Sequence, residues 1–145
     1  MDVRIMQQCD LQQVAELEKS IFSKPWSYKS FEDSLSLSNA IYVVAVNNGE
    51  IMGYSGLYCV LNEANITNVA VKKEVRNKGI GYGMLVELID EAKKRGIESV
   101  TLEVRKSNDA AIHLYEQLGF ESAGIRKEFY ELPKEDAVIM WKKNL

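Results

Sequence analysis

The sequence predicts a mixed α/β fold in which one sheet carries helices on both faces. Runs rich in β-forming residues alternate with segments of helical periodicity. A strand, a helix and a second strand follow one another across 65–105, and such a unit is a right-handed crossover between parallel neighbours. The predicted order is β-α-α-β-β-β-α-β-α-β-β. We expect residues 1–145 to form a single domain, because this length can bury a proper core.

The first 36 residues predict one strand and two helices. Alternation over 3–7 is typical of a strand, and Asp10 can cap the helix that follows. That helix carries one apolar stripe, formed by Leu11, Val14, Leu17 and Ile21. A loop at 22–26 leads to Ser27, which can cap a second helix running to about residue 36.

Three strands are expected next. The runs 41–46 and 51–61 flank Asn47-Asn48-Gly49-Glu50, which is a hairpin signal. Residues 65–71 predict another strand, antiparallel to its predecessor.

Residues 76–83, Arg-Asn-Lys-Gly-Ile-Gly-Tyr-Gly, join that strand to an amphipathic helix at 80–95. Glycines at 79, 81 and 83 lack a Cβ, so we expect positive φ angles and close approach of a ligand to the main chain. The glycines lie at the helix N-terminus, where unpaired amides and the helix dipole favour an anion. The segment therefore predicts a phosphate-binding loop, the alternative being a glycine-rich turn that binds nothing.

Spacing separates this loop from two better-known phosphate loops. The nucleoside-triphosphate loop needs Lys followed by Ser or Thr after its last glycine, whereas Tyr82 and Gly83 follow Gly81. In the dinucleotide fingerprint the third glycine would come later. The remaining pattern, Arg or Gln-x-x-Gly-x-Gly or Ala, is matched by Arg76, Gly79 and Gly81. This pattern resembles the pyrophosphate loop of the Gcn5-related N-acetyltransferases (GNAT).

The last third of the chain predicts a strand, a helix and two closing strands. The strand 98–105 places Thr101, Glu103 and Arg105 on one face. Asn108 or Ser107 then caps a helix that ends at Gly119. The closing strands are expected at 120–126 and 137–141, joined through Leu132-Pro133.

A second motif extends the resemblance to nearly the whole chain. Asn108-x-x-Ala111-x-x-Leu114-Tyr115-x-x-Leu118-Gly119-Phe120 resembles the second conserved block of the GNAT family, and the element order is that of its fold. The family's two central parallel strands splay apart. The resemblance implies acetyl-CoA as the acetyl donor, bound by Val69, Ala70 and Val71 along the pantetheine arm, by Arg76, Asn77, Lys78, Gly79, Ile80 and Gly81 at the pyrophosphate, and by Asn108. Asn108 could equally be a plain helix cap.

Acetyl transfer to an amine requires a base and benefits from an acid. A peptide α-amine has a pKa near 8, so at neutral pH a base must take a proton from the ammonium form. Glu103, near the carboxyl end of a central strand, is the candidate base, acting directly or through one water. Tyr115, by its place in the family block, is the candidate acid for the thiolate leaving group. The alternatives are a salt-bridged glutamate and a core aromatic.

The fragment 102–116 resembles more narrowly the bacterial RimI-type ribosomal-protein-alanine N-acetyltransferases. Phe22-x-x-Pro25-Trp26-Ser27 and Arg126-x-x-x-Tyr130 resemble that group's peptide-binding loops. The resemblance implies a protein N-terminus as acceptor, notably the alanine of small-subunit ribosomal protein eighteen, in a slot lined by Phe22, Trp26 and Tyr130. Trp26 could instead only staple the following helix. Acetylation of a small amine and a non-catalytic acyl-CoA-binding domain stay open as alternatives.

Composition restricts the other function classes. Cys9 and Cys59 are too few for a disulfide framework or a zinc site, and His113 is the only histidine, so we expect metal-free chemistry. A net charge of −3 argues against nucleic-acid binding. The apolar run 40–46 is far shorter than the roughly 20 residues that cross a bilayer, and no signal segment is evident, so we expect a cytoplasmic protein without membrane contact. The sequence leaves the oligomeric state open.

Overall fold

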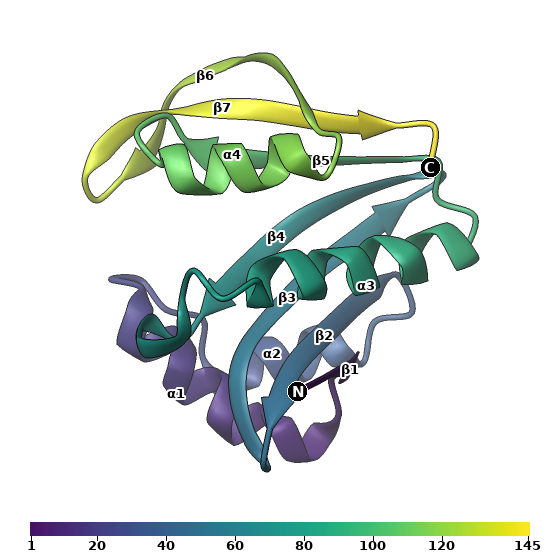
Figure 1. Cartoon of the computed structure of the whole chain (residues 1–145), viewed down its shortest axis with the longest axis vertical. Coiled ribbons are helices and arrows are strands. Elements are labelled where there is room, and N and C mark those ends of the chain that lie inside the picture. The colour runs from purple at the N-terminus through teal and green to yellow at the C-terminus, as the bar shows by residue number, and fades with distance from the viewer.

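In the computed structural model, which describes residues 1–145, seven strands form one mixed sheet in the order β1-β2-β3-β4-β5-β7-β6 (Figure 1). The strands are β1 (Asp2–Ile5), β2 (Ala40–Asn47), β3 (Glu50–Val60), β4 (Glu63–Val71), β5 (Ser99–Arg105), β6 (Glu121–Glu131) and β7 (Lys134–Lys143). The helices are α1 (Leu11–Ile21), α2 (Tyr28–Leu35), α3 (Ile80–Lys94) and α4 (Asp109–Gln117), with 3-10 turns η1 (Gln8–Asp10) and η2 (Lys73–Val75). The predicted fold class and element order are confirmed.

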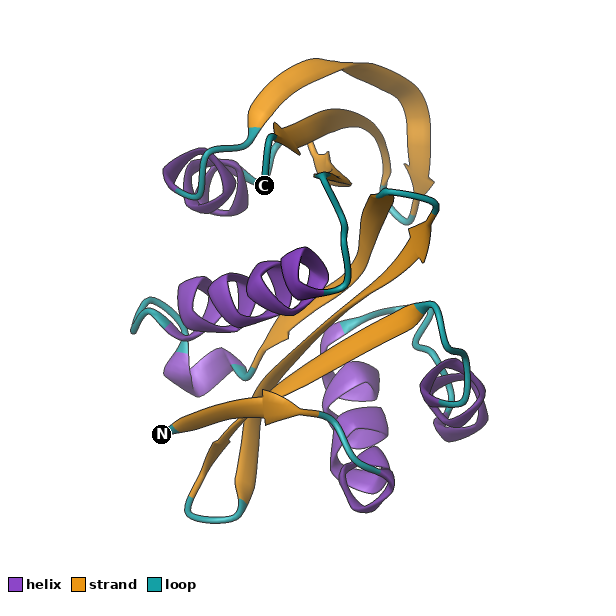
Figure 2. Ribbon diagram, turned by 90° about the vertical axis from the view of Figure 1, so that its right-hand side faces the viewer, coloured by secondary structure: helices purple, strands orange, loops and turns teal.

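The helices cover both faces of the sheet. Figure 2 shows α3 and α4 on one side of the strands and α1 and α2 on the other. Strand β2 is buried from both sides: Val43 belongs to the core under α3, and Tyr42 and Val44 belong to the core under α1 and α2. Burial on both faces explains why this strand is a continuous apolar run. None of the four helices is long and apolar enough to cross a bilayer.

The parallel strands β4 and β5 are paired only over their first halves. Residues 63–66 pair with 99–102, and beyond this point β4 pairs only with β3 and β5 only with β7. The two strands therefore diverge, as the left side of Figure 1 shows. The register of β3 and β4 shifts between Gly56 and Leu57, and such a bulge bends a strand where the divergence begins. Both the parallel pairing and the splay were predicted.

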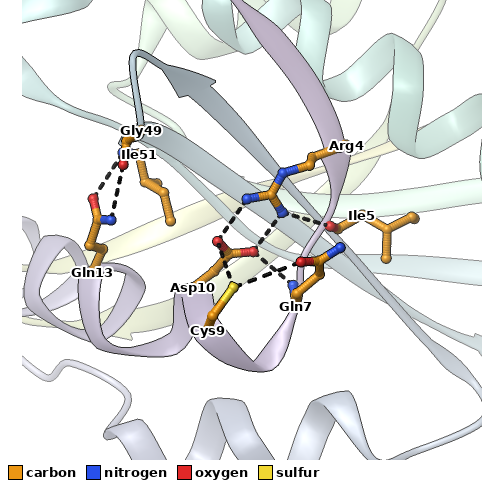
Figure 3. A network of polar contacts seen from close by, with 8 residues as sticks. All are labelled: Arg4, Ile5, Gln7, Cys9, Asp10, Gln13, Gly49 and Ile51. Atoms are coloured by element: carbon orange, nitrogen blue, oxygen red, sulfur yellow. Dashed lines mark hydrogen bonds and ion pairs between the residues drawn. The ribbon is translucent and has the colours of Figure 1, made fainter.

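The start of α1 differs from prediction, because Asp10 does not cap the helix with its side chain. Its carboxylate accepts two hydrogen bonds from Arg4, at 2.7 and 2.9 Å, and one from the Gln7 N–H at 2.7 Å (Figure 3). Asp10 has helical backbone angles, φ −86° and ψ −17°, rather than the extended conformation of a side-chain cap. Figure 3 also shows Gln13, which ties α1 to the β2–β3 turn through Gly49 and Ile51.

The closing strands β6 and β7 are longer than predicted. Their pairing is interrupted after Arg126 and resumes at Tyr130, next to the Leu132-Pro133 turn. In the interruption Glu128 has a φ of +51°. Because β6 is an exposed edge strand, its second half lacks the alternation that marks a half-buried strand.

Candidate active site

A groove of about 1170 Å³ opens where β4 and β5 separate. Its walls come from the end of β4, the start of α3, α4 and the end of α1. They contain Phe22, Val69, Ala70, Val71, Arg76, Asn77, Gly79, Ile80, Gly81, Asn108 and Tyr115 of the predicted site residues. Because Phe22 comes from the α1 side of the sheet and Tyr115 from the α4 side, the groove passes between the diverging strands.

The phosphate-loop segment forms the N-terminal end of α3. Gly79 is the N-cap with φ +81° and no capping side chain, and the first helical hydrogen bond runs from the Gly83 N–H to the Gly79 carbonyl. The amides of residues 79–82 therefore precede the helical ladder and lack partners within it. They provide a row of donors at the positive end of the helix dipole.

The prediction of positive φ angles is correct for Gly79 and wrong for Gly81 and Gly83. Only Gly79 has a positive φ; Gly81 and Gly83 lie within α3, and the second left-handed residue is Asn77 with φ +63°. A Cβ at Gly81 would lie 3.3 Å from Leu114 Cδ2, whereas one at Gly83 would meet nothing within 4 Å. Gly81 therefore allows a close approach of α3 to α4 at the groove, because any larger residue would have to displace the Leu114 side chain.

Of the two basic residues in the loop, Arg76 and Lys78, only Arg76 lines the groove. Its Nε donates to the Val71 carbonyl at 3.0 Å, which fastens the loop to the end of β4. Lys78, alone among the predicted donor-binding residues, does not line the groove.

Asn108 is the N-cap of α4, which settles the choice between Ser107 and Asn108. Its Oδ1 accepts from the Ala111 N–H at 3.2 Å. The side-chain nitrogen of Asn108 makes no hydrogen bond within the protein, so capping leaves a donor free at the groove wall.

Tyr115 lies on α4, 6% exposed, with its ring 5.9 Å from that of Phe120. The helix ends with Gly119 at φ +94° and a hydrogen bond from the Phe120 N–H to the Tyr115 carbonyl, 3.0 Å long. Burial, with a smaller contribution from nearby Tyr130, raises the pKa of Tyr115 to about 12. The hydroxyl is therefore protonated throughout the neutral range.

Glu103 lies on β5 just beyond the last residue paired with β4. Its neighbours Leu102 and Val104 face the core beneath α3 and α4, so Glu103 points to the opposite face. The carboxylate forms an ion pair with Arg126, 3.3 Å away, and its side chain is 20% exposed. The two catalytic candidates thus come from opposite faces of the sheet, on either side of the splay.

The predicted acceptor residues belong to two segments on the Glu103 side. Trp26 contacts Phe31 with ring centroids 5.3 Å apart, which is the hydrophobic staple named as its alternative. The α1–α2 loop, residues 22–27, is joined to the β6–β7 hairpin by the ion pair Lys24–Glu131 at 2.9 Å. Tyr130 lies in this hairpin beneath the Arg105 guanidinium. The structure thus brings the loop of Phe22 and Trp26 into contact with the hairpin of Tyr130.

Several groove residues were not among the predicted site residues. They are Ile21, Val75, Tyr82, Ala110, Ala111, His113, Leu114 and Gln117. Ala111 and Leu114 share one face of α4 with Tyr115 through i, i+3 and i+4 spacing, and this signal could have identified them.

Comparison with known proteins defines the class. Residues 11–120 match the model of the Acetyltransferase (GNAT) family, and the chain belongs to this family. The resemblance predicted from the two sequence motifs is thereby confirmed.

Similar proteins within this family are named as enzymes that acetylate one ribosomal protein. The chain is 38% identical over 133 residues to the ribosomal protein bS18-alanine N-acetyltransferase of Escherichia coli (strain K12), covering 90% of this chain and 89% of that protein. It is 39% identical over 141 residues to a putative enzyme of the same name from Bacillus subtilis (strain 168). The match covers 96% of this chain and 93% of that protein. The crystal structure of the Escherichia coli ribosomal-protein-S18-alanine N-acetyltransferase matches with a TM-score of 0.89 at 35% identity, over 99% of this chain and 93% of that chain.

Proposed function

We propose that this protein transfers the acetyl group of acetyl-CoA to the N-terminal α-amine of a protein, with the alanine of ribosomal protein bS18 as its acceptor. The observation that carries the proposal is the groove at the splay, which joins the amides at the start of α3 to Tyr115 and to Phe22 of the α1–α2 loop. The names of the relatives support the choice of acceptor.

The groove fits the donor molecule. Free amides at residues 79–82 suit a pyrophosphate, and Arg76 adds a positive charge beside them. Residues 69–71 of β4 have no partner strand on the side of β5, so the backbone groups that face this side can bind the amides of a pantetheine arm, although the Val71 carbonyl already accepts from Arg76. When bound, acetyl-CoA supplies an acyl group activated as a thioester.

Two side chains then divide the proton transfers. Glu103 accepts a proton from the acceptor ammonium, directly or through one water, and leaves the amine lone pair free to form the new C–N bond. Tyr115 donates its phenolic proton to the departing sulfur as the C–S bond breaks, and the acylated nitrogen gives its second proton to the Tyr115 phenolate, directly or through water, which restores the phenol. A pKa of about 12 keeps Tyr115 protonated at working pH, and it also makes the phenol a weaker acid than an exposed tyrosine, so the proton moves only once the sulfur carries most of the thiolate charge. The ion pair from Arg126 keeps the Glu103 carboxylate ordered before the acceptor arrives.

The acceptor slot lies between the α1–α2 loop and the β6–β7 hairpin. Phe22 and Trp26 are 41% and 36% exposed, so both have apolar surface left for a peptide after packing within the loop. Tyr130 contributes from the hairpin. Glu103 is on the same face of the sheet as these two segments, and the proposal requires the α-amine to reach it.

A panel of acceptors tests this proposal. The full-length protein is given acetyl-CoA with a peptide that begins with the alanine of bS18, with the same peptide blocked at its N-terminus but containing a lysine, and with spermidine or an aminoglycoside. Thiol release and product mass are measured. We expect acetylation of the free α-amine alone. Activity confined to the small amines would refute the proposed acceptor, and no thiol release with any amine would refute the enzymatic role.

A further inference from the structure

Arg105 ends β5, and its guanidinium contacts the β6–β7 hairpin at four points. Nη1 donates to the Pro133 carbonyl at 2.8 Å and to the Glu135 carboxylate at 3.3 Å, and Nη2 donates to the Leu132 carbonyl at 3.0 Å. The guanidinium carbon lies 4.3 Å from the centroid of the Tyr130 ring. One side chain therefore fixes both the turn of the hairpin and the aromatic ring beside it.

Glu135 extends these contacts to the other wall of the site. While Oε1 accepts from Arg105, Oε2 accepts from the Ser107 N–H at 2.7 Å. Ser107 directly precedes Asn108, which caps α4 and lines the groove. Arg105 and Glu135 thus connect the hairpin to the segment that begins α4, and their side chains are 29% and 20% exposed.

From these contacts we propose that Arg105 is a positioning residue for the acceptor. It holds Tyr130 and the hairpin turn in the place where they receive the acceptor N-terminus. This inference rests on the proposed function, since it takes Tyr130 as part of the acceptor slot. Arg105 does not line the donor groove and makes no hydrogen bond or ion pair with Glu103, so we expect it to act on acceptor binding through Tyr130 and not on the chemical step.

The geometry requires arginine rather than any cation. A guanidinium is flat and carries donors in fixed directions, so it can stack on an aromatic ring while its edge bonds two carbonyl groups. A lysine ammonium at the same position keeps the charge near Glu135 but cannot stack in this way. Arg105→Lys therefore keeps the positive charge but removes the stacking on Tyr130 and the paired hydrogen bonds to the turn.

Steady-state kinetics with the bS18-type peptide test the inference. We expect Arg105→Lys to raise the KM for the peptide about tenfold, as when one charge-assisted contact is lost, with kcat and the KM for acetyl-CoA changed less than about twofold. Arg95→Lys is the matched control, because it makes the same exchange at an exposed arginine that follows α3, outside the groove and the hairpin. It should leave every kinetic constant unchanged.

A double-mutant cycle tests whether Arg105 acts through Tyr130. If it does, Arg105→Lys adds no further rise in peptide KM once Tyr130→Ala is present. Should Arg105→Lys fail to fold, Glu135→Gln replaces it in the same cycle, since it weakens the contact to Arg105 and retains an oxygen for the Ser107 N–H.

The outcomes separate this inference from the proposed function. A wild-type protein that does not acetylate the peptide refutes the function itself. A wild-type protein that acetylates it, with Arg105→Lys unchanged in peptide KM or additive with Tyr130→Ala, refutes the positioning role. Equal losses in kcat and in both KM values would mark Arg105 as merely structural.

Discussion

At the scale of single residues, the observed ion pair of Glu103 competes with its proposed role as a base. Its carboxylate is paired with Arg126 at 3.3 Å, and the proposed chemistry requires it to take a proton from an incoming ammonium. The acceptor's own charge can replace the guanidinium, because both are cations seeking the same oxygens. The ion pair is therefore compatible with catalysis as long as Arg126 is free to move, and its side chain is 56% exposed.

The pH profile of Glu103→Gln separates a base from a structural glutamate. At neutral pH the variant should lose about 10²- to 10⁴-fold in kcat/KM, the usual contribution of general base catalysis. The loss should shrink above roughly pH 8, where the α-amine releases its proton unaided. Initial rates between pH 6 and 9.5 measure this. A loss of the same size at every pH would mean that Glu103 serves only the ion pair.

Tyr115→Phe removes a proton donor and leaves the ring that packs on Phe120. We expect kcat to fall about 10²-fold or more, with the Kd of acetyl-CoA unchanged within twofold. Because the folded pKa is raised to about 12, the wild-type protein should show no alkaline decline from Tyr115 up to pH 10. Turnover by stopped-flow and donor binding by calorimetry check both statements. Undiminished turnover would exclude the acid role.

Residues near the site were predictable where a motif fixes their spacing, as for Gly79, Asn108 and Tyr115. Their partners were not. Arg126 reaches Glu103 from 23 positions away, and Lys24 reaches Glu131 from 107 positions away. Such pairs depend on sheet register and on loop paths, which single-residue patterns do not contain.

At the scale of elements, the contact between α3 and α4 decides how close the groove walls can be. Gly81 and Gly83 lie in the same helix, but only Gly81 faces Leu114. The same substitution at both positions therefore has the same effect on helix propensity and a different effect on the groove.

We expect Gly81→Leu to weaken acetyl-CoA binding at least tenfold, since its side chain enters the groove wall, while Gly83→Leu binds normally. Calorimetric titration with coenzyme A measures binding, and thermal unfolding verifies that both variants are folded. Tight binding by a folded Gly81→Leu protein would contradict the location of the donor site.

Helix ends and buried strands were the elements that the sequence predicted best. Gly119 follows α4 with a positive φ, as a glycine after an apolar stripe indicates. The full length of β6 was missed because an edge strand with both faces exposed has no hydrophobic period. The splay of β4 and β5 came from the family resemblance. The bulge opposite Gly56 was not predicted, although a glycine inside a strand is a common sign of one.

At the scale of the whole molecule, the site depends on strands that diverge while the sheet stays continuous. The proposed donor-binding residues come largely from α3 and α4 on one face, and the proposed acceptor-binding residues come from the α1–α2 loop and the β6–β7 hairpin on the other. The fold must therefore hold α1 firmly against the sheet. Arg4 and Asp10 contribute to this, because they join β1 to the turn that starts α1 (Figure 3).

The Arg4–Asp10 pair predicts how the folded state responds to acid. Burial by itself raises the pKa of Asp10, but the hydrogen bonds from Arg4 and from the Gln7 N–H outweigh it, so the pKa lies below its usual range. A carboxyl whose pKa is lower in the folded state stabilises that state above its unfolded pKa, about 3.9, and this contribution is lost as the pH falls through the folded pKa. The pair should therefore stabilise the protein at neutral pH and not in strong acid.

Asp10→Asn tests this by urea unfolding at pH 7 and at pH 2.5. At pH 7 the variant should lose roughly 1–3 kcal/mol of unfolding free energy, the cost of breaking a partly buried charged hydrogen bond. At pH 2.5 the difference in unfolding free energy between the variant and the wild type should be smaller, because the wild-type carboxyl is then being protonated. Asp33→Asn, which breaks an exposed pair with Lys29, should not change stability measurably at either pH. If Asp10→Asn lost the same unfolding free energy at pH 7 and at pH 2.5, the negative charge of Asp10 would not be the source of its stabilising effect.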